Sequence, residues 1–237
     1  MHACRNQAYS PHQGTLLLDW QPYADGEAVT RAAERLGFRV QWTGISRDIP
    51  ISPRMALLNR KAQKVVYENP ADFTWLVDDD ILPDVWCLSD LLDCMNDTNA
   101  AAVGARLVNV QNYAPAFPPG QSWKHEPECG APVRSPMLSQ ACLLAETCTF
   151  LDTWQWSHKE RFGEDLVMTA QMELNPARRG CWFHPGATCL HVRIEGEETW
   201  RKTPLTIRDL WDGLEAAGIN KEQRQAFAAK IGENPEP

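Results

Sequence analysis

The sequence predicts an α/β fold in which helices cover both faces of a mostly parallel central sheet. Apolar segments of strand length recur along the chain, and segments with helical spacing of apolar residues separate them. The first three elements follow in the order strand, helix, strand. Parallel strands need a crossover connection, which a helix usually supplies, so this alternation is typical of a sheet covered on both faces. We expect the crossovers to be right-handed.

The opening unit shows the pattern. Residues 15–20, Thr-Leu-Leu-Leu-Asp-Trp, are typical of a buried strand. Residues 25–27 begin an amphipathic helix, and Gly37 ends it because glycine readily adopts the left-handed conformation found after helices. Residues 38–42 then alternate as a second strand.

The middle of the chain continues the alternation. A proline-broken loop at residues 48–53 precedes a helix that ends at the Asn-Pro pair 69–70. That helix leads into an apolar strand over 73–77. Apolar residues at helical spacing predict a helix over 85–95, and residues 100–110 are typical of a further strand.

The second half begins with a long segment rich in Pro, Gly and Asn, residues 111–136, which predicts a loop over one face of the sheet. Loops of this length in compact domains are often binding loops or lids. A strand, two helices and a late strand are expected next, over 137–144, 147–156, 162–174 and 180–191.

Two more helices are expected near the C-terminus, over 206–217 and 221–231. We therefore expect one main domain over residues 1–195, with residues 196–237 as a helical extension packed on the same domain. The length of 237 residues and the composition, 43% hydrophobic and 23% charged, are ordinary for a globular α/β protein.

The charge balance excludes some classes of protein. A formal net charge of −8 leaves no broad basic field, so a surface that coats nucleic acid or anionic membrane is not expected. No apolar run approaches the roughly 20 residues that a membrane span needs, and no secretory signal pattern is seen.

The eight cysteines include no Cys-x-x-Cys pair, which disfavours zinc-ribbon and thioredoxin-like sites. Several lie in apolar stretches, where cysteine behaves as a small core residue. We expect a reduced, cytoplasmic protein.

Three carboxylates follow the third predicted strand. Residues 73–80 read Phe-Thr-Trp-Leu-Val-Asp-Asp-Asp, so a buried strand runs directly into Asp78, Asp79 and Asp80. A strand that ends in acids places hard oxygen ligands at the edge of a sheet, where a divalent cation can hold a phosphate group. An aspartate-rich surface turn is the plainer alternative, and the apolar strand before it makes that interpretation less attractive.

Two further groups could carry chemistry. Glu164 and Asp165 stand at a predicted helix start, and His191 ends the late strand. Acids at a helix N-terminus stabilise the helix, so this pair by itself favours a structural role. A single histidine is likewise more often a satisfied structural residue than a metal ligand.

In their order along the chain, these motifs resemble those of nucleotide-sugar glycosyltransferases of the GT-A fold, especially the family 2-like enzymes. Those enzymes carry an Asp-x-Asp at the end of a central strand, then a Glu-Asp, a glycine, a proline and a histidine. This chain has Asp78-Asp79-Asp80, Gly163-Glu164-Asp165, Gly180, Pro185 and His191, preceded by a helix with Arg54 and Asn59-Arg60. The likeness covers residues 50–195 and implies a Rossmann-like GT-A domain.

The resemblance implies transfer of a sugar from a nucleoside-diphosphate donor to an acceptor hydroxyl, with Mn²⁺ or Mg²⁺ as cofactor. Asp80 is the preferred metal ligand and His191 completes the protein ligands. Asp78 either shares the metal or reaches the ribose. Asp79 is also expected to contact the nucleotide-sugar donor, together with Arg54 and Asn59 from the preceding helix.

Attack on the anomeric carbon needs a base to take the proton of the acceptor hydroxyl. The resemblance assigns this role to Asp165, with Glu164 orienting it or contacting the acceptor, and the reverse division stays open. A base on the acceptor face implies inversion of the anomeric configuration.

The N-terminal part departs from the family. No Asp-Asp-x-Ser-x-Asp cluster follows the second strand, so the nucleobase pocket is poorly defined. Asp19 and Asp48 are the carboxylates nearest the places where a base-binding carboxylate usually lies. Most of the ten tryptophans, Trp75 and Trp86 among them, lie at core spacing and are expected to pack inside.

Two other functions remain open. A nucleotidyltransferase would use the same metal chemistry, but the glycine-rich N-terminal loop with a basic residue that it needs is not visible before Asp19. A non-catalytic descendant that binds nucleotide or glycan is the other. The acceptor could be a saccharide, a protein side chain or a modified nucleobase.

Overall fold

The computed structural model describes residues 2–5, 7, 14–18, 26–46, 48–108, 130–155, 164–192 and 207–231. The helices are α1 (His2–Arg5), α2 (Gly26–Arg35), α3 (Ile51–Glu68), α4 (Cys87–Thr98), α5 (Thr147–Leu151), α6 (Glu164–Glu173), α7 (Ile207–Ala216) and α8 (Lys221–Ile231). The strands are β1 (Gly14–Leu18), β2 (Phe38–Trp42), β3 (Phe73–Val77), β4 (Ile81–Pro83), β5 (Ala102–Val108), β6 (Val133–Arg134), β7 (Cys142–Glu146) and β8 (Cys181–His191).

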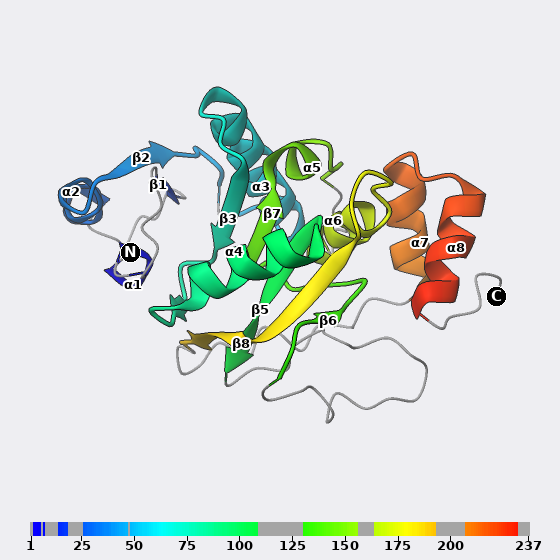
Figure 1. Ribbon diagram of the computed structural model, residues 1–237. Helices are drawn as coiled ribbons and strands as arrows, with labels where there is room; N and C mark the ends of the chain where they lie inside the picture. The colour runs from blue at the N-terminus through cyan, green and yellow to red at the C-terminus, as the bar shows by residue number, and fades with distance from the viewer. Residues whose placement is uncertain are drawn as a thin grey trace.

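The described strands form two sheets. β1 and β2 pair in parallel, and the larger sheet has the order β3-β7-β5-β8-β4, with β6 also pairing β8 (Figure 1). In the larger sheet, β3, β5 and β8 run in one direction, whereas β7, β4 and β6 run in the other. This sheet is therefore mixed rather than mostly parallel. A short apolar strand has the same residue pattern in either direction, so strand direction could not be predicted from it.

Helices cover both faces of the larger sheet, as expected. On one face, Leu88, Leu91 and Met95 of α4 pack against a cluster that includes Val103 and Leu144. The neighbouring strand residues point to the opposite face, because side chains alternate along a strand. There, side chains of α3, α5 and α6 pack against the sheet in a second cluster: Ala62, Val66, Phe150, Met168 and Met172. Figure 1 shows α4 in front of the sheet and α3 behind it.

Most boundaries of the predicted elements lie within three residues of the observed ones, and the short elements α1, β4 and β6 were not predicted. Helix α3 begins at Ile51, inside the predicted loop, because Pro53 lies in the first turn, where its missing N–H is not needed. Helix α5 ends at Leu151 instead of reaching residue 156. Strand β7 begins at Cys142, so residues 137–141 form an irregular segment before it.

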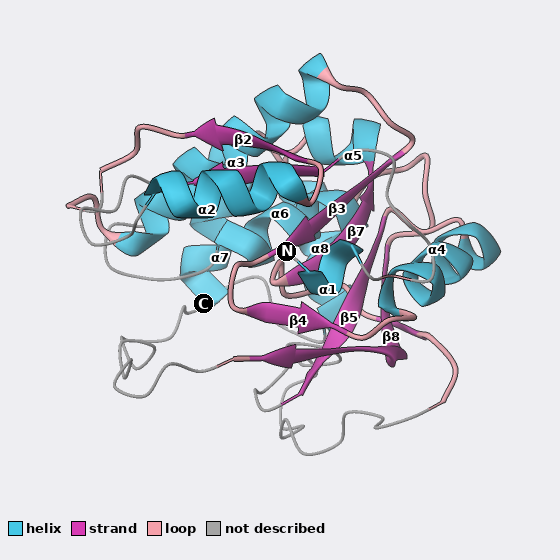
Figure 2. Cartoon of the chain, turned by 90° about the vertical axis from the view of Figure 1, so that its left-hand side faces the viewer, coloured by secondary structure: helices cyan, strands magenta, loops and turns pink. Residues whose placement is uncertain are grey.

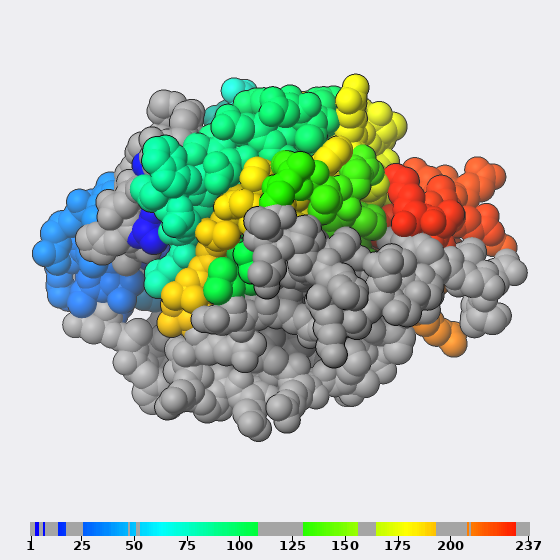
Figure 3. Space-filling model, turned by 60° about the horizontal axis from the view of Figure 1, so that its bottom comes forward, coloured from blue at the N-terminus to red at the C-terminus, as the bar shows by residue number. Residues whose placement is uncertain are grey.

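The C-terminal helices pack on α6. Leu210 and Leu214 of α7 and Phe227 of α8 form a cluster with Leu166 and Val167 of α6. The α7–α8 pair lies at the end of the molecule opposite α2 and β2 (Figures 1 and 3). None of the helices in the described ranges has the length and apolar character needed to cross a membrane.

Candidate functional site

The three aspartates form the turn between β3 and β4. The N–H of Asp78 donates to the carbonyl of Ala141 at 3.0 Å, and the N–H of Ile81 donates back to the carbonyl of Asp78 at 3.2 Å. The second bond closes a tight turn that reverses the chain after β3. Asp79 is exposed at its tip, whereas the Asp80 side chain is only 29% exposed.

The turn places Asp80 beside His191. Strand β4 pairs antiparallel with the end of β8, so that Ile81 lies opposite His191, and the N–H of Val192 donates to the carbonyl of Asp80 at 2.8 Å. His191 Nε2 and Asp80 Oδ2 are 3.1 Å apart, and the His191 side chain is 12% exposed. Figure 2 shows β4 lying along β8 at this rim of the sheet. The fold thus brings together a carboxylate oxygen and an imidazole nitrogen from distant parts of the sequence, and both side chains are largely shielded from solvent.

An irregularity in β8 contributes to this arrangement. The pairing of β5 with β8 runs from Ala105 opposite His184 to Arg106 opposite Thr188, so three residues of β8 bulge out. His184 Nδ1 accepts the N–H groups of Gly186 and Ala187, each at 3.1 Å, in place of ladder bonds. An odd number of extra residues changes the face to which later side chains point, so the bulge helps determine the direction of His191.

The Asp80–His191 pair fits a divalent cation. Two ligands of one octahedral ion, each about 2.1 Å from it, lie about 3 Å apart, which matches the observed spacing. Carboxylate oxygen and imidazole nitrogen together suit Mn²⁺ and related ions. Among the residues that the structure describes, no cluster of three or more His, Cys, Asp or Glu side chains is arranged to hold a metal ion. An octahedral ion would need further ligands beyond these two side chains.

Of the two α3 residues predicted to contact the nucleotide-sugar donor, Asn59 is linked to the acidic turn, and its amide is already hydrogen-bonded. Asn59 is 3% exposed, and its amide exchanges two hydrogen bonds with the amide of Gln140, one of them 2.9 Å long from Asn59 Nδ2 to Gln140 Oε1. Gln140 precedes Ala141, which accepts the bond from Asp78. Asn59 therefore helps to fix the segment that supports the acidic turn. Arg54 lies about one and a half turns earlier on the same helix and is half-buried.

The predicted base, Asp165, stands in the first turn of α6. Its Oδ1 accepts the N–H of Leu166 at 2.8 Å, which is a local bond at the helix start. Thr169, four residues later and hence on the same face of α6, accepts the N–H of Leu138 through its hydroxyl at 3.2 Å. The face of α6 that carries Asp165 thus contacts the 137–141 segment. Glu164 is the first residue of α6.

The 137–141 segment joins the three parts of the candidate site. Leu138 bonds to α6, Gln140 to α3 and Ala141 to the acidic turn. The structure therefore connects Asp78, Asn59 and the Asp165 face through one short stretch of backbone. Two acids, Asp19 and Asp48, were predicted for the nucleobase pocket. Asp48 is exposed after β2, where its side chain bonds the hydroxyl of Ser46, and Asp19 lies outside the described residues.

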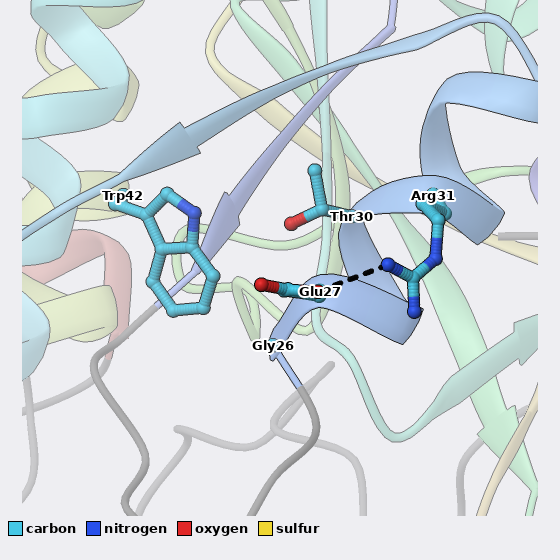
Figure 4. A pocket seen from close by; sticks show the side chains of 5 residues that line it. All are labelled: Gly26, Glu27, Thr30, Arg31 and Trp42. Carbon is cyan, nitrogen blue, oxygen red and sulfur yellow. Dashed lines mark hydrogen bonds and ion pairs between the residues drawn. The ribbon is translucent and has the colours of Figure 1, made fainter.

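A separate hollow lies at the end of β2, away from the acidic turn. It has a volume of about 310 Å³ and is lined by Gly26, Glu27, Thr30, Arg31 and Trp42 (Figure 4). Trp42 packs directly on Gly26, and Arg31 pairs with Glu27 on the exposed side of α2. A binding site usually has several buried polar groups that point into it, whereas the charged residues that line this hollow are an exposed ion pair. Asp80 and His191 are therefore the better candidate for the functional site.

Comparison with solved structures identifies the fold. The TarS protein of S. aureus, crystallised as residues 1–349 with UDP-GlcNAc, superposes with a TM-score of 0.64 at 11% identity and covers 96% of this chain and 65% of that one. GalNAc-T7, crystallised with UDP, GalNAc and Mn²⁺, gives a TM-score of 0.56 at 13% identity and covers 96% and 47%. This chain has the GT-A-like fold of nucleotide-sugar glycosyltransferases.

The match to these proteins is partial. This chain spans less than two thirds of the length of TarS 1–349 and about half of GalNAc-T7. No protein-family model matches the sequence, and no curated protein sequence matches it. The similarity is thus a similarity of fold, which sequence comparison alone does not detect.

Proposed function

We propose that this protein is a glycosyltransferase that moves a sugar from a nucleoside-diphosphate donor to an acceptor hydroxyl with the help of a divalent cation. The observation that carries the proposal is the meeting of Asp80 and His191, 3.1 Å apart, at the end of an acidic turn in a GT-A-like fold. TarS was crystallised with UDP-GlcNAc and GalNAc-T7 with UDP, GalNAc and Mn²⁺, which supports a uridine-diphosphate donor here.

Asp80 and His191 would hold Mn²⁺ or Mg²⁺, with Asp78 as a further ligand or a contact to the ribose. When bound, such an ion acts as a Lewis acid that stabilises the charge on a diphosphate leaving group. Asp79, exposed at the tip of the turn, and Arg54 on α3 would contact the nucleotide-sugar donor. Asn59 would act through the 137–141 segment, because Gln140 already occupies its amide.

Asp165 would accept the proton of the acceptor hydroxyl, since it stands on the face of α6 that contacts the 137–141 segment. Glu164 would orient Asp165 or contact the acceptor. A base on the acceptor side of the donor gives inversion at the anomeric carbon. We place this activity in the main domain.

The test measures turnover of UDP-GlcNAc and UDP-GalNAc, by hydrolysis or transfer, with Mn²⁺ and after chelation. Asp80→Asn, which keeps shape but loses charge, is expected to lower the rate about 100-fold or more and to weaken Mn²⁺ binding seen by electron paramagnetic resonance. Asp93→Asn, at an exposed carboxylate on α4, is the matched control and should change neither.

Full activity in Asp80→Asn, with unfolding unchanged, would show that the metal assignment is wrong. Release of pyrophosphate from nucleoside triphosphates would instead favour the nucleotidyltransferase. Binding of UDP with Mn²⁺ but no turnover of any donor would indicate a descendant that only binds.

A further inference from the structure

Trp154 presents an indole ring to solvent between α5 and α6. The residue is 52% exposed, so burial in the core does not explain it. Two other tryptophans, Trp42 and Trp86, are comparably exposed. Trp154 differs from them in what holds it and in what lies beside it.

The backbone of Trp154 is fixed to helix α6 in both directions. Its N–H donates to Gln171 Oε1 at 2.7 Å, and Gln171 Nε2 donates to its carbonyl at 2.9 Å. Gln171 Nε2 is itself anchored to the carbonyl of Val167 at 3.1 Å. An exposed aromatic ring on a backbone held this way is pre-organised, so a ligand that stacks on it loses little entropy in ordering the protein.

Arg60 of α3 lies over one face of the Trp154 ring. Its guanidinium carbon lies 5.4 Å from the centre of the Trp154 ring, and Nη2 donates to the carbonyl of Gln155 at 3.2 Å. The stacked guanidinium keeps the indole in one orientation. Because one such bond uses one of five N–H donors, the group retains donors for a ligand.

The residue next to Trp154 has a buried acceptor that lacks a partner. Gln155 is 3% exposed, and its Oε1 has no hydrogen-bond partner among the described residues. Its Nε2 donates to the hydroxyl of Thr153 at 3.0 Å, and this hydroxyl in turn donates to the carbonyl of Phe150 at 2.7 Å. The Thr153 hydroxyl has already donated its proton to Phe150, so it can only accept from Gln155, and the Gln155 amide cannot be flipped. Oε1 of Gln155 is therefore the atom that still needs a hydrogen-bond donor.

These groups together match a pyranose ring. The C–H face of a sugar stacks on an indole, and its hydroxyls supply the donors that Gln155 Oε1 needs and the acceptors that Arg60 needs. Gln171, which holds the backbone of Trp154, follows Asp165 by six residues on α6. Six residues span about 9 Å along a helix, roughly the length of two linked sugars.

We propose that Trp154, Gln155 and Arg60 form a saccharide subsite that holds the acceptor about two sugar units from the reacting hydroxyl. The inference rests on the proposed glycosyltransferase activity and deepens it, since it selects a carbohydrate among the possible acceptors. We expect saccharides to bind at this subsite without the nucleotide-sugar donor.

The test uses saturation-transfer NMR with the free sugars glucose, galactose and N-acetylglucosamine and their β-linked disaccharides, with nucleosides as a comparison arm. Wild type should transfer saturation to sugar ring protons of at least one disaccharide, and Trp154→Ala should bind it about tenfold more weakly. Trp42→Ala is the matched control, being another half-exposed tryptophan, and should bind like wild type. Trp154→Phe keeps an aromatic face and should retain part of the binding.

Donor hydrolysis in the same variants separates the two proposals. Unchanged hydrolysis of UDP-GlcNAc or UDP-GalNAc in Trp154→Ala, with weaker disaccharide binding, supports the subsite. If the protein hydrolyses no nucleotide-sugar donor but still binds a disaccharide through Trp154, the subsite is supported and the proposed function is wrong. No sugar binding by wild type, equal binding by a folded Trp154→Ala, or saturation of nucleosides alone overturns the subsite.

Discussion

Glu173 is a buried carboxylate at the end of α6, with its side chain 1% exposed. Its Oε1 pairs with Arg134 of β6 and with Lys230 of α8, the latter at 2.8 Å, and its Oε2 accepts the N–H of Cys181 at 2.6 Å. A charge buried this deeply is tolerated only with its partners in place. Glu173 thus ties α6 to the start of β8, to β6 and to α8.

Gly180 leaves the space that this carboxylate needs. Its φ is +70°, and a Cβ at this position would overlap Glu173 Oε2 and come against Arg134 Nη2. We expect Gly180→Ala to lower the free energy of unfolding by at least about 2 kcal/mol, from left-handed strain plus displacement of the carboxylate. Urea denaturation measures this loss.

Gly218→Ala serves as its control. Gly218 has a similar φ of +81°, but no atom lies within 4 Å of the point that a Cβ would occupy there. This substitution should therefore cost only the backbone strain, about 1 kcal/mol. Equal losses in the two variants would show that the contact with Glu173 is not important.

Among the elements, β8 carries the feature on which the candidate site depends most. The bulge after His184 shifts the pairing with β5 before the strand reaches β4, where His191 meets Asp80. Pro185 lies in the bulge, where a residue without an N–H is acceptable. The ring of His184 stabilises the bulge only while Nδ1 is unprotonated, because it accepts two backbone N–H groups there.

The bulge makes stability depend on pH. Burial lowers the pKa of His184 below its usual value, more than the nearby Asp90 raises it. The unfolded chain therefore binds a proton first as the pH falls, so the free energy of unfolding should decrease from about pH 6.5 downward. In His184→Asn, whose side-chain oxygen can accept the same N–H groups without titrating, this decrease should be smaller.

Denaturation at pH values of about 7.5, 6.5 and 5.5, which bracket the usual pKa of histidine, measures the difference between the two proteins. Asp90 is present in both, so its own titration largely cancels in the comparison. The same pH slope in wild type and variant would contradict the assigned role of His184.

At the scale of the whole molecule, the C-terminal helices are joined to the sheet domain through α6. Phe227 is fully buried, with its ring 6.1 Å from that of Trp211 in an edge-to-face arrangement, and it belongs to the cluster that contains Leu166 and Val167. Lys230 adds an ion pair to Glu173 at 2.8 Å. Because α6 also carries Asp165, the extension supports the helix on which we place the base.

We expect Phe227→Ala to destabilise the whole protein by about 3 kcal/mol, since it leaves a cavity between α6 and α8. Unfolding followed by circular dichroism and by tryptophan fluorescence should give one coincident transition. Tyr67→Ala, at a side chain 76% exposed, should change stability by no more than about 0.5 kcal/mol. A separate early transition in Phe227→Ala would mean that the extension folds on its own.

Much of the fold could be predicted from local patterns. The helices that begin near Gly26 and Lys221 and the strand before Asp78 follow from the spacing of apolar residues and from Gly and Pro at element ends. Trp86 was predicted to be buried, and this was wrong: it precedes the first residue of α4 and is 60% exposed. Trp154 had no sequence signal, because its exposure and its contacts come from α3 and α6.

The sequence by itself determined the order of the longer strands and helices and the position of three carboxylates at the end of an apolar strand, because both depend on neighbouring residues. Only the tertiary structure decided the strand directions, the pairing of β4 with β8 and the bulge at His184. These features bring Asp80 to His191. Pairing between distant strands depends on the packing of the entire sheet, which no local pattern of residues encodes.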